Sequence, residues 1–146
     1  MDIINKILKL FEINIIKTIL LNFRLFPFRV AVKIPIIVYG RYYVYNIMSL
    51  QRGQIELRCP CKTGMVRLNR RIGVNLGCRL RGTLCLQGKI IIEGICDIGQ
   101  GCNLTIRKGA KLYVSDRLSI TGASKIHVYE HVRFGRRVII SWNVQI

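Results

Sequence analysis

Apolar residues recur at every sixth position in the second half of the chain. In "IIEGICDIGQGCNL", residues 91–104, Ile92, Ile98 and Leu104 stand six apart, and so do Cys96 and Cys102. An α-helix has a period of 3.6 residues and a single strand a period of 2, so neither explains this spacing. The pattern predicts a structure in which a short strand and a corner together take six residues.

Two sets of positions carry this period to the end of the chain. The first runs in steps of six from Val66 to Val144, and 13 of its 14 residues are apolar. The second runs from Leu68 to Ile146, and 12 of its 14 residues are apolar, against only 12 of the other 53 residues in the span. Residues i and i+2 of a strand point to the same side, so each hexad is predicted to place two side chains inward.

Hexapeptide repeats are typical of a parallel β-helix. With three faces, a coil of this kind takes about 18 residues. One inward column is then predicted to contain Cys78, Cys96, Val114 and Val132. Gly and Asn residues that follow inward positions, such as Gly99 and Asn69, suit the positive φ of a corner. Residues 108–124 fit less well, because Lys108, Asp116 and Gly122 fall in inward positions, and one coil is predicted to be distorted there.

The N-terminal third has a different pattern. Residues 2–26 are rich in Ile, Leu and Phe with interspersed Lys and Arg, Asp2 is a candidate cap, and Pro27 is expected to end a helix. Charged residues interrupt every apolar run, which argues against a spanning helix, and no cleavage-site pattern of a signal peptide follows. Two interpretations stay open: a helix that caps the first coil or a neighbouring subunit, and a basic amphipathic helix on a membrane surface.

The sequence therefore predicts an all-β protein, a parallel β-helix preceded by a helix. We expect an N-terminal amphipathic helix over 1–26, lead-in strands over 27–65, with a strand, turn and strand in 34–48, and the hexapeptide-repeat β-helix over 66–146.

Charge adds a candidate partner class. The net charge is +17; residues 1–50 carry seven basic and two acidic groups, and residues 51–146 carry seventeen and five. A surface of this kind attracts phosphorylated cofactors, anionic lipid or acidic polysaccharide, although Lys and Arg also simply fill outward strand positions. No motif for sequence-specific nucleic-acid binding is present.

Cysteine and histidine suggest little chemistry. Cys78, Cys96 and Cys102 fall in inward positions, where a thiol is a small apolar filler, and "CPC" (Cys59 and Cys61) lacks zinc-knuckle spacing. No metal site is predicted, and the thiols are expected to stay reduced in a cytoplasm. His127 and His131 fall outside the inward positions, so they are expected to face solvent.

Three stretches together resemble a known family: "FPFRVAVKIPIIVYGRYYVY", "IIEGICDIGQGCNLTIRKGAKL" and "RLSITGASKIHVYEHVRFGRRVIISWNVQI". They are similar to the bacterial hexapeptide-repeat acyltransferases, above all the O-acetyltransferases of capsular or surface polysaccharide clusters. The resemblance implies a left-handed β-helix, a homotrimer with sites between subunits, and no metal. It also implies transfer of acetyl from acetyl-CoA to a sugar or polysaccharide hydroxyl, with a His as general base.

The family pattern continues from "S-W-[DN]-V-x-I" to an acidic stretch and the catalytic His. The resemblance therefore implies Ser141, Trp142 and Asn143 as substrate-binding residues at the rim of a cleft, and no catalytic residue in this chain. Arg136 and Arg137 replace the acidic or amide residues common in the family. Because the last residues are apolar and uncapped, we expect the chain to be incomplete at its C-terminus.

Three hypotheses follow. The first is an acetyl-CoA-dependent O-acetyltransferase, cytoplasmic or peripheral at the inner face of the membrane through residues 1–26, with transfer impaired in this chain. The second is a catalytically inactive β-helix, as a remnant or an assembly subunit. The third is a basic membrane- or polyanion-binding module.

Overall fold

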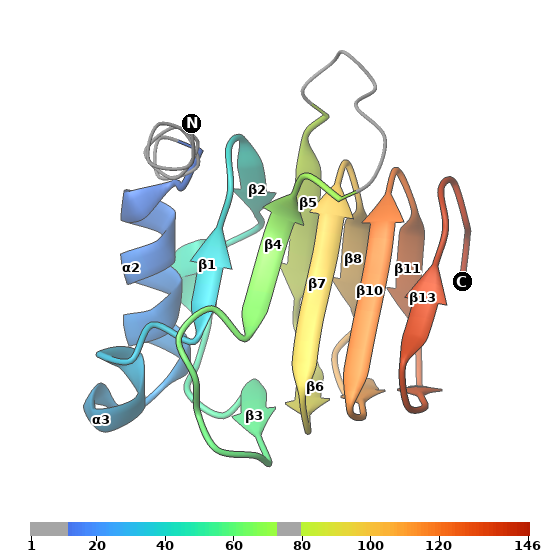
Figure 1. Ribbon diagram of the computed structural model, residues 1–146. Helices are drawn as coiled ribbons and strands as arrows, with labels where there is room; N and C mark the ends of the chain where they lie inside the picture. Colours follow the sequence, from blue (N-terminus) through green and yellow to red (C-terminus); the bar gives the residue numbers. More distant parts are fainter. Residues whose placement is uncertain (1–11, 73–79) are drawn as a thin grey trace.

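The computed structural model describes residues 12–72 and 80–146, and these residues form a coil of three parallel sheets with two helices at one end (Figure 1). The front sheet contains β1 (Ile36–Val38), β4 (Val66–Arg70), β7 (Ile95–Gln100), β10 (Arg117–Gly122) and β13 (Val138–Ile140). The back sheet contains β2 (Tyr42–Val44), β5 (Gly82–Leu86), β8 (Asn103–Ile106) and β11 (Lys125–Val128). The lower sheet contains β3 (Ile55–Leu57), β6 (Lys89–Ile92), β9 (Lys111–Val114) and β12 (His131–Phe134). The helices are α2 (Ile15–Leu25) and α3 (Phe28–Ala31), with a short 3-10 helix, η1 (Ile47–Ser49), between β2 and β3.

The coil is left-handed, which confirms the predicted fold class. In Figure 1 the chain rises along the front sheet, crosses over the top, descends along the back sheet and returns through the lower sheet as it advances away from the helices. Each set of three strands is one rung, and β1–β3 form the first. Residues 36–57, expected to be lead-in strands, therefore lie in the same three sheets as the later rungs.

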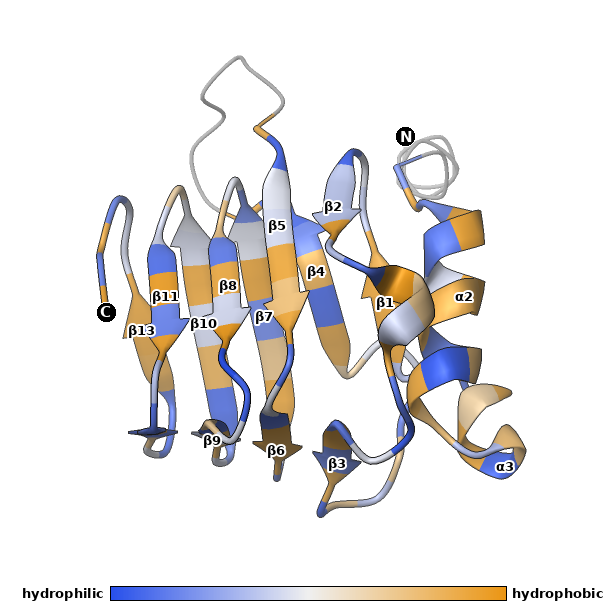
Figure 2. Ribbon diagram, turned by 180° about the vertical axis from the view of Figure 1, so that it is seen from behind, coloured by the Kyte–Doolittle hydropathy of each residue, from blue (hydrophilic) through white to orange (hydrophobic). Residues whose placement is uncertain are grey.

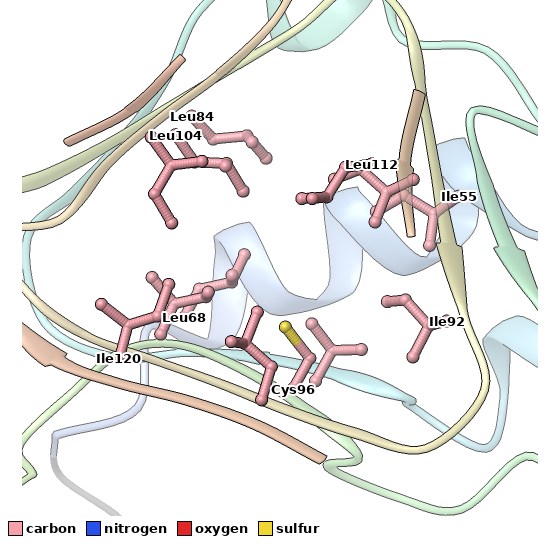
Figure 3. Close-up of a pocket in the computed structure, with 13 residues that line it drawn as sticks. Ile55, Leu68, Leu84, Ile92, Cys96, Leu104, Leu112 and Ile120 are labelled. Atoms are coloured by element: carbon pink, nitrogen blue, oxygen red, sulfur yellow. The ribbon is translucent and has the colours of Figure 1, made fainter. Parts of the chain in front are cut away.

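Apolar side chains from all three sheets fill the interior. Figure 3 shows the groups pointing toward one another: Leu84 and Leu104 from the back sheet, Leu68, Cys96 and Ile120 from the front sheet, and Ile55, Ile92 and Leu112 from the lower sheet. The space left between them is only about 20 Å³, so the interior is a packed core. Each buried Leu or Ile contributes about 1.5–3 kcal/mol through removal of apolar surface from water.

The register of the strands corrects the predicted column. Cys96 pairs with Val66 and Leu118, whereas Val114 pairs with Ile92 and Phe134, so Cys96 and Val114 are not neighbours. Cys78, the first residue of that column, lies outside the described residues. From β4 to β7 the coil advances by 30 residues, and later it advances by 20, as from β5 to β8, or by 22, as from β7 to β10. The predicted repeat of about 18 residues is therefore wrong.

The longer repeat has a local cause. The front strands β7 and β10 have six residues each, whereas β8, β9, β11 and β12 have four. The inward position consequently moves by eight residues from Cys96 to Leu104 and again from Leu118 to Ile126. A four-residue corner at 107–110 adds the same extra two residues between β8 and β9.

At these three places the inward position moves by eight residues where the pattern predicts six, a slip of two residues each time. The three slips explain why the six-residue pattern holds before and after this stretch and fails within it. Their sum is one hexad, so the inward positions return to phase at Ile126. Within the slipped stretch, Ile106, Leu112 and Leu118 take the buried positions, and Lys108 lies exposed on a corner. The distortion predicted for 108–124 is thus a shift of phase.

One corner is held by a buried asparagine. Asn69 has a positive φ of 62° and is only 2% exposed. Its Oδ1 accepts hydrogen bonds from the backbone N–H groups of Gly82 (3.1 Å) and Gly101 (3.2 Å), and its Nδ2 donates to the carbonyl of Tyr39 (3.0 Å). These partners belong to three different rungs, so one side chain ties the corner together along the coil axis.

Helix α2 closes the first rung. The side-chain amide of Asn22 pairs with β1 as the backbone of a neighbouring strand would. Its Nδ2 donates to Ile36 O (2.7 Å), and its Oδ1 accepts from Ile36 N (3.0 Å). Thr18 Oγ1 accepts from Val38 N (3.0 Å), and the backbone N–H of Asn14 donates to Val38 O (2.8 Å). The outward backbone groups of β1 therefore all have partners, as buried peptide groups require.

The ends of α2 follow the expected helix signals in part. The helix ends before Pro27, as predicted, with Phe26 as its C-cap. Asn14 is the N-cap, and its side chain accepts from Lys17 N. Asp2, the predicted cap, lies outside the described residues.

Substitution of Asn69 by Ala should destabilise the protein by about 3–5 kcal/mol. The change leaves the backbone groups that Asn69 binds, in three rungs, without hydrogen-bond partners. Alanine would also have to keep the positive φ, without the side-chain hydrogen bonds that offset this cost for Asn. Urea unfolding followed by circular dichroism measures the loss. Asn143→Ala is the matched control, since Asn143 also has a positive φ (56°) but is exposed, and it should cost about 1 kcal/mol. Equal losses in the two variants would contradict the assigned role.

Candidate functional site

A surface cleft follows the corner where the lower sheet meets the front sheet. We call it the lower-corner cleft; its volume is about 540 Å³. The residues that line it come from successive rungs: Cys59, Pro60, Lys62 and Met65 from the loop after β3, Glu93, Gly94 and Ile95 between β6 and β7, Asp116 and Arg117 between β9 and β10, and Arg137 before β13.

Close stacking of the corners forms the floor of this cleft. A Cβ atom on Gly94 would lie 1.7 Å from the carbonyl oxygen of Asp116, so only glycine permits the two corners to approach in this way. The backbone N–H of Ile95 donates to the same carbonyl (2.9 Å). The cleft is therefore built on a rigid backbone edge.

Three cations and two carboxylates line the lower-corner cleft. Arg137 Nε lies 3.8 Å from Asp116 Oδ2, but the two side chains are 85% and 60% exposed. An exposed ion pair of this length contributes little, so the guanidinium is available to a ligand. Lys62 and Arg117 have no carboxylate within 4.0 Å among the described residues. The arrangement suits a ligand with several anionic groups that also carries hydrogen-bond donors.

The thiols near this cleft are not activated. Burial raises the pKa of the Cys59 and Cys61 thiols above the usual range, so both are protonated at neutral pH. Burial, with a smaller contribution from Asp97, raises the pKa of Cys96 to about 12. In the described part of the chain no three His, Cys, Asp or Glu residues stand close enough to hold a metal ion. Cys96 and Cys102 are buried core residues, as predicted.

The three residues implied by the resemblance lie together at another corner, where the front sheet meets the back sheet. Ser141 and Asn143 are exposed, and Trp142 is half-buried with its ring against Gly122. Ser124 holds this turn, since its Oγ donates to Ser141 O (3.0 Å) and accepts from Val144 N (3.1 Å).

The two candidate sites stand at opposite ends of β13. Arg137 precedes this strand and Ser141 follows it, so their backbones are about 13 Å apart along an extended chain. Ser141, Trp142 and Asn143 do not line the lower-corner cleft. A ligand that reaches both sites must therefore extend along the last described rung.

The two histidines do not form a common site. His127 lies on the outer face of β11 in the back sheet, and His131 lies on the outer face of β12 in the lower sheet. Both are exposed, as expected, and the His131 ring lies 5.1 Å from the ring of Tyr113. Neither is among the residues of the lower-corner cleft.

The front sheet contains a buried acidic residue whose burial the sequence pattern did not predict. Asp97 lies on the outer face of β7, yet its side chain is only 7% exposed. Its Oδ1 lies 3.1 Å from Arg67 Nε and 3.5 Å from Arg70 Nη1, although no described group directs a well-aligned hydrogen bond at that atom. The cluster joins β4 to β7 and is a structural ion-pair network.

A second surface cleft, of about 320 Å³, separates the helices from the lower sheet. Apolar residues dominate its walls, among them Leu25, Pro27, Val30 and Leu57. At its rim Glu56 lies between Lys89 and Arg58, and hydrogen bonds from these two cations hold its pKa well below the usual range. This pairing satisfies the charges locally, so we assign no chemistry to the second cleft.

Comparison with models of protein families, with curated proteins and with solved structures found no match to this chain.

Alkylation should separate the thiols by their position in the coil. In the folded protein at mildly alkaline pH, iodoacetamide should modify the half-buried Cys59, Cys61 and Cys85, and modify Cys96 and Cys102 only after denaturation. Peptide mass spectrometry measures each site. Modification of Cys96 at the rate found for Cys85 would contradict the packed interior.

Proposed function

We propose that the protein is an acyltransferase of the hexapeptide-repeat type, which transfers acetyl from acetyl-CoA to a hydroxyl group of a sugar or surface polysaccharide. The observation that carries the proposal is the left-handed coil of three parallel sheets, the fold that the resemblance implies. The three stretches that carry the resemblance form α3, β1 and β2 near the start of the coil, the third and fourth rungs, β7–β9 and β10–β12, and β13. Since one fold hosts many activities, the site must supply the rest of the argument.

The lower-corner cleft supports binding of the acyl donor. CoA carries phosphate groups and an adenine with an amino donor. Lys62, Arg117 and Arg137 suit the phosphates, because charge-assisted hydrogen bonds to phosphate are among the strongest in proteins. Glu93 and Asp116 can accept hydrogen bonds from donor groups of the same ligand.

The corner of Ser141, Trp142 and Asn143 is proposed to bind the acceptor. An exposed hydroxyl and an exposed amide next to a half-buried indole offer polar contacts to sugar hydroxyls and an apolar surface for the ring. The resemblance places such a site between the subunits of a homotrimer, which we propose for this protein as well.

The proposed reaction is a simple acyl exchange. The acceptor oxygen attacks the thioester carbonyl and forms a C–O bond, backbone N–H groups stabilise the oxyanion, and the C–S bond then breaks. A general base takes the proton of the acceptor hydroxyl and then gives it to the sulfur of CoA, which leaves as a thiol. We assign the base to none of the described residues, because His127 and His131 lie on outer faces away from the lower-corner cleft.

Titration calorimetry of the full chain with acetyl-CoA tests the binding step. Replacing Lys62 and Arg117 together by Gln should weaken binding at least about tenfold, because each lost charge-assisted contact is worth about 1.5–3 kcal/mol. Lys108→Gln with Lys125→Gln is the matched control, since it removes the same charge from exposed positions outside the cleft and should leave affinity unchanged.

Mass spectrometry of sugar acceptors incubated with the protein and acetyl-CoA tests transfer. Absence of any acetyl-CoA binding, or equal losses in the two charge variants, would overturn the assignment of the lower-corner cleft.

A further inference from the structure

The solvent-facing side of α2 is apolar. Thr18, Leu21, Asn22 and Leu25 face β1 and are buried. On the opposite side Ile15, Ile16, Ile19 and Phe23 are 64%, 78%, 48% and 42% exposed. The helix thus packs one side against the coil and presents an apolar side that points away from it.

The same surface continues onto α3. Phe28 is 68% exposed and its ring lies 6.0 Å from that of Phe23, and Val32, after the end of α3, is 50% exposed. We call the six residues Ile15, Ile16, Ile19, Phe23, Phe28 and Val32 the apolar helix face. Figures 1 and 2 both place these helices at one end of the coil, so the face lies at an end of the structure. Contiguous exposed apolar surface of this kind marks an interaction site.

Positive charge predominates along the part of the chain that forms and borders the apolar helix face. From Ile13 to Ile55 the chain contains six Lys or Arg residues and no Asp or Glu. Arg29 and Lys33 lie exposed on and after α3, next to Phe28 and Val32, and Arg52 is exposed in the loop that reaches the end of α2. Apolar side chains bordered by cations match a partner that offers both an apolar interior and anionic groups.

We infer that the apolar helix face binds to the surface of an anionic lipid bilayer. The Ile and Phe side chains enter the boundary between headgroups and acyl chains, and Arg29 and Lys33 contact lipid phosphates. Among the described residues no helix has the length and apolar character to span a membrane. The inference is independent of acyl transfer.

A second copy of the chain fits this face less well. A two-fold contact would pair this face with the same face of a second copy, which has the same bordering cations, Arg29 and Lys33, and no Asp or Glu between Ile13 and Ile55 to pair with them. Like charges brought together in this way oppose association, whereas anionic lipid neutralises them.

Sedimentation of the full chain with vesicles tests the inference. The protein should bind vesicles of phosphatidylcholine mixed with phosphatidylglycerol, should bind pure phosphatidylcholine much less, and should lose affinity as salt is raised. The double variant Ile16→Glu with Phe28→Glu should bind at least about tenfold more weakly, because both side chains would lose their apolar burial.

Ile139→Glu with Tyr129→Glu is the matched control, since it adds the same two negative charges and Tyr129 is 62% exposed outside the apolar helix face. Ile139 is 76% exposed, on β13, at the other end of the coil, so this variant should retain binding. Circular dichroism should show that all variants are folded.

Three results would overturn the inference. The first is failure of the full chain to bind the mixed vesicles. The second is an equal loss of binding in the test and control variants. The third is a shift of the double variant to a smaller oligomer in sedimentation velocity with unchanged vesicle binding, which would assign the face to a second copy. Calorimetry with acetyl-CoA is a separate measurement, so failure of either proposal can be told from failure of the other.

Discussion

The need of every buried backbone group for a partner governs this structure. In a parallel coil each rung supplies hydrogen bonds to the next, so the first rung is left with an open strand edge. Here the side chains of Asn22 and Thr18, with the backbone of Asn14, pair with the outward groups of Ile36 and Val38. A helix thus ends the sheet by hydrogen bonding as well as by packing, and rung-to-rung pairing can proceed from a closed start.

Because the interior is packed, chemistry is confined to the outside of the coil. The corners are the natural places for it, since backbone from successive rungs converges there and polar side chains point outward, as at the lower-corner cleft. Corners also need special residues: Gly94 where two rungs nearly touch, and Asn69 where three rungs are tied together. The same constraint that stacks the rungs therefore sets the spacing of the groups a ligand would meet.

The sequence predicted the kind of fold because alternation and corners are local properties. It could not predict the register, because after a slip of two residues the first set of inward positions falls on the second, and the second set falls on positions that belong to neither. Leu112 and Leu118 are core residues that the strict period passed over. The pairing of Asn22 with β1, the burial of Asp97 and the convergence of Lys62 with Arg137 depend on contacts between distant segments, which a single sequence does not reveal.

Disulfide trapping across β9 and β12 tests the stacked coil and its register most directly. The structure pairs Tyr113 with Arg133, whereas a strict hexad coil would pair Tyr113 with His131. The Cα atoms of directly paired residues are about 4.8 Å apart, whereas those of residues two positions out of register are about 8 Å apart. Only the shorter distance permits a disulfide. With Cys59, Cys61, Cys78 and Cys85 replaced by Ser, mild oxidation should crosslink Tyr113→Cys with Arg133→Cys, read as the loss of two hydrogens by mass spectrometry. A crosslink instead in the Tyr113→Cys and His131→Cys variant, or in neither, would contradict the coil described above.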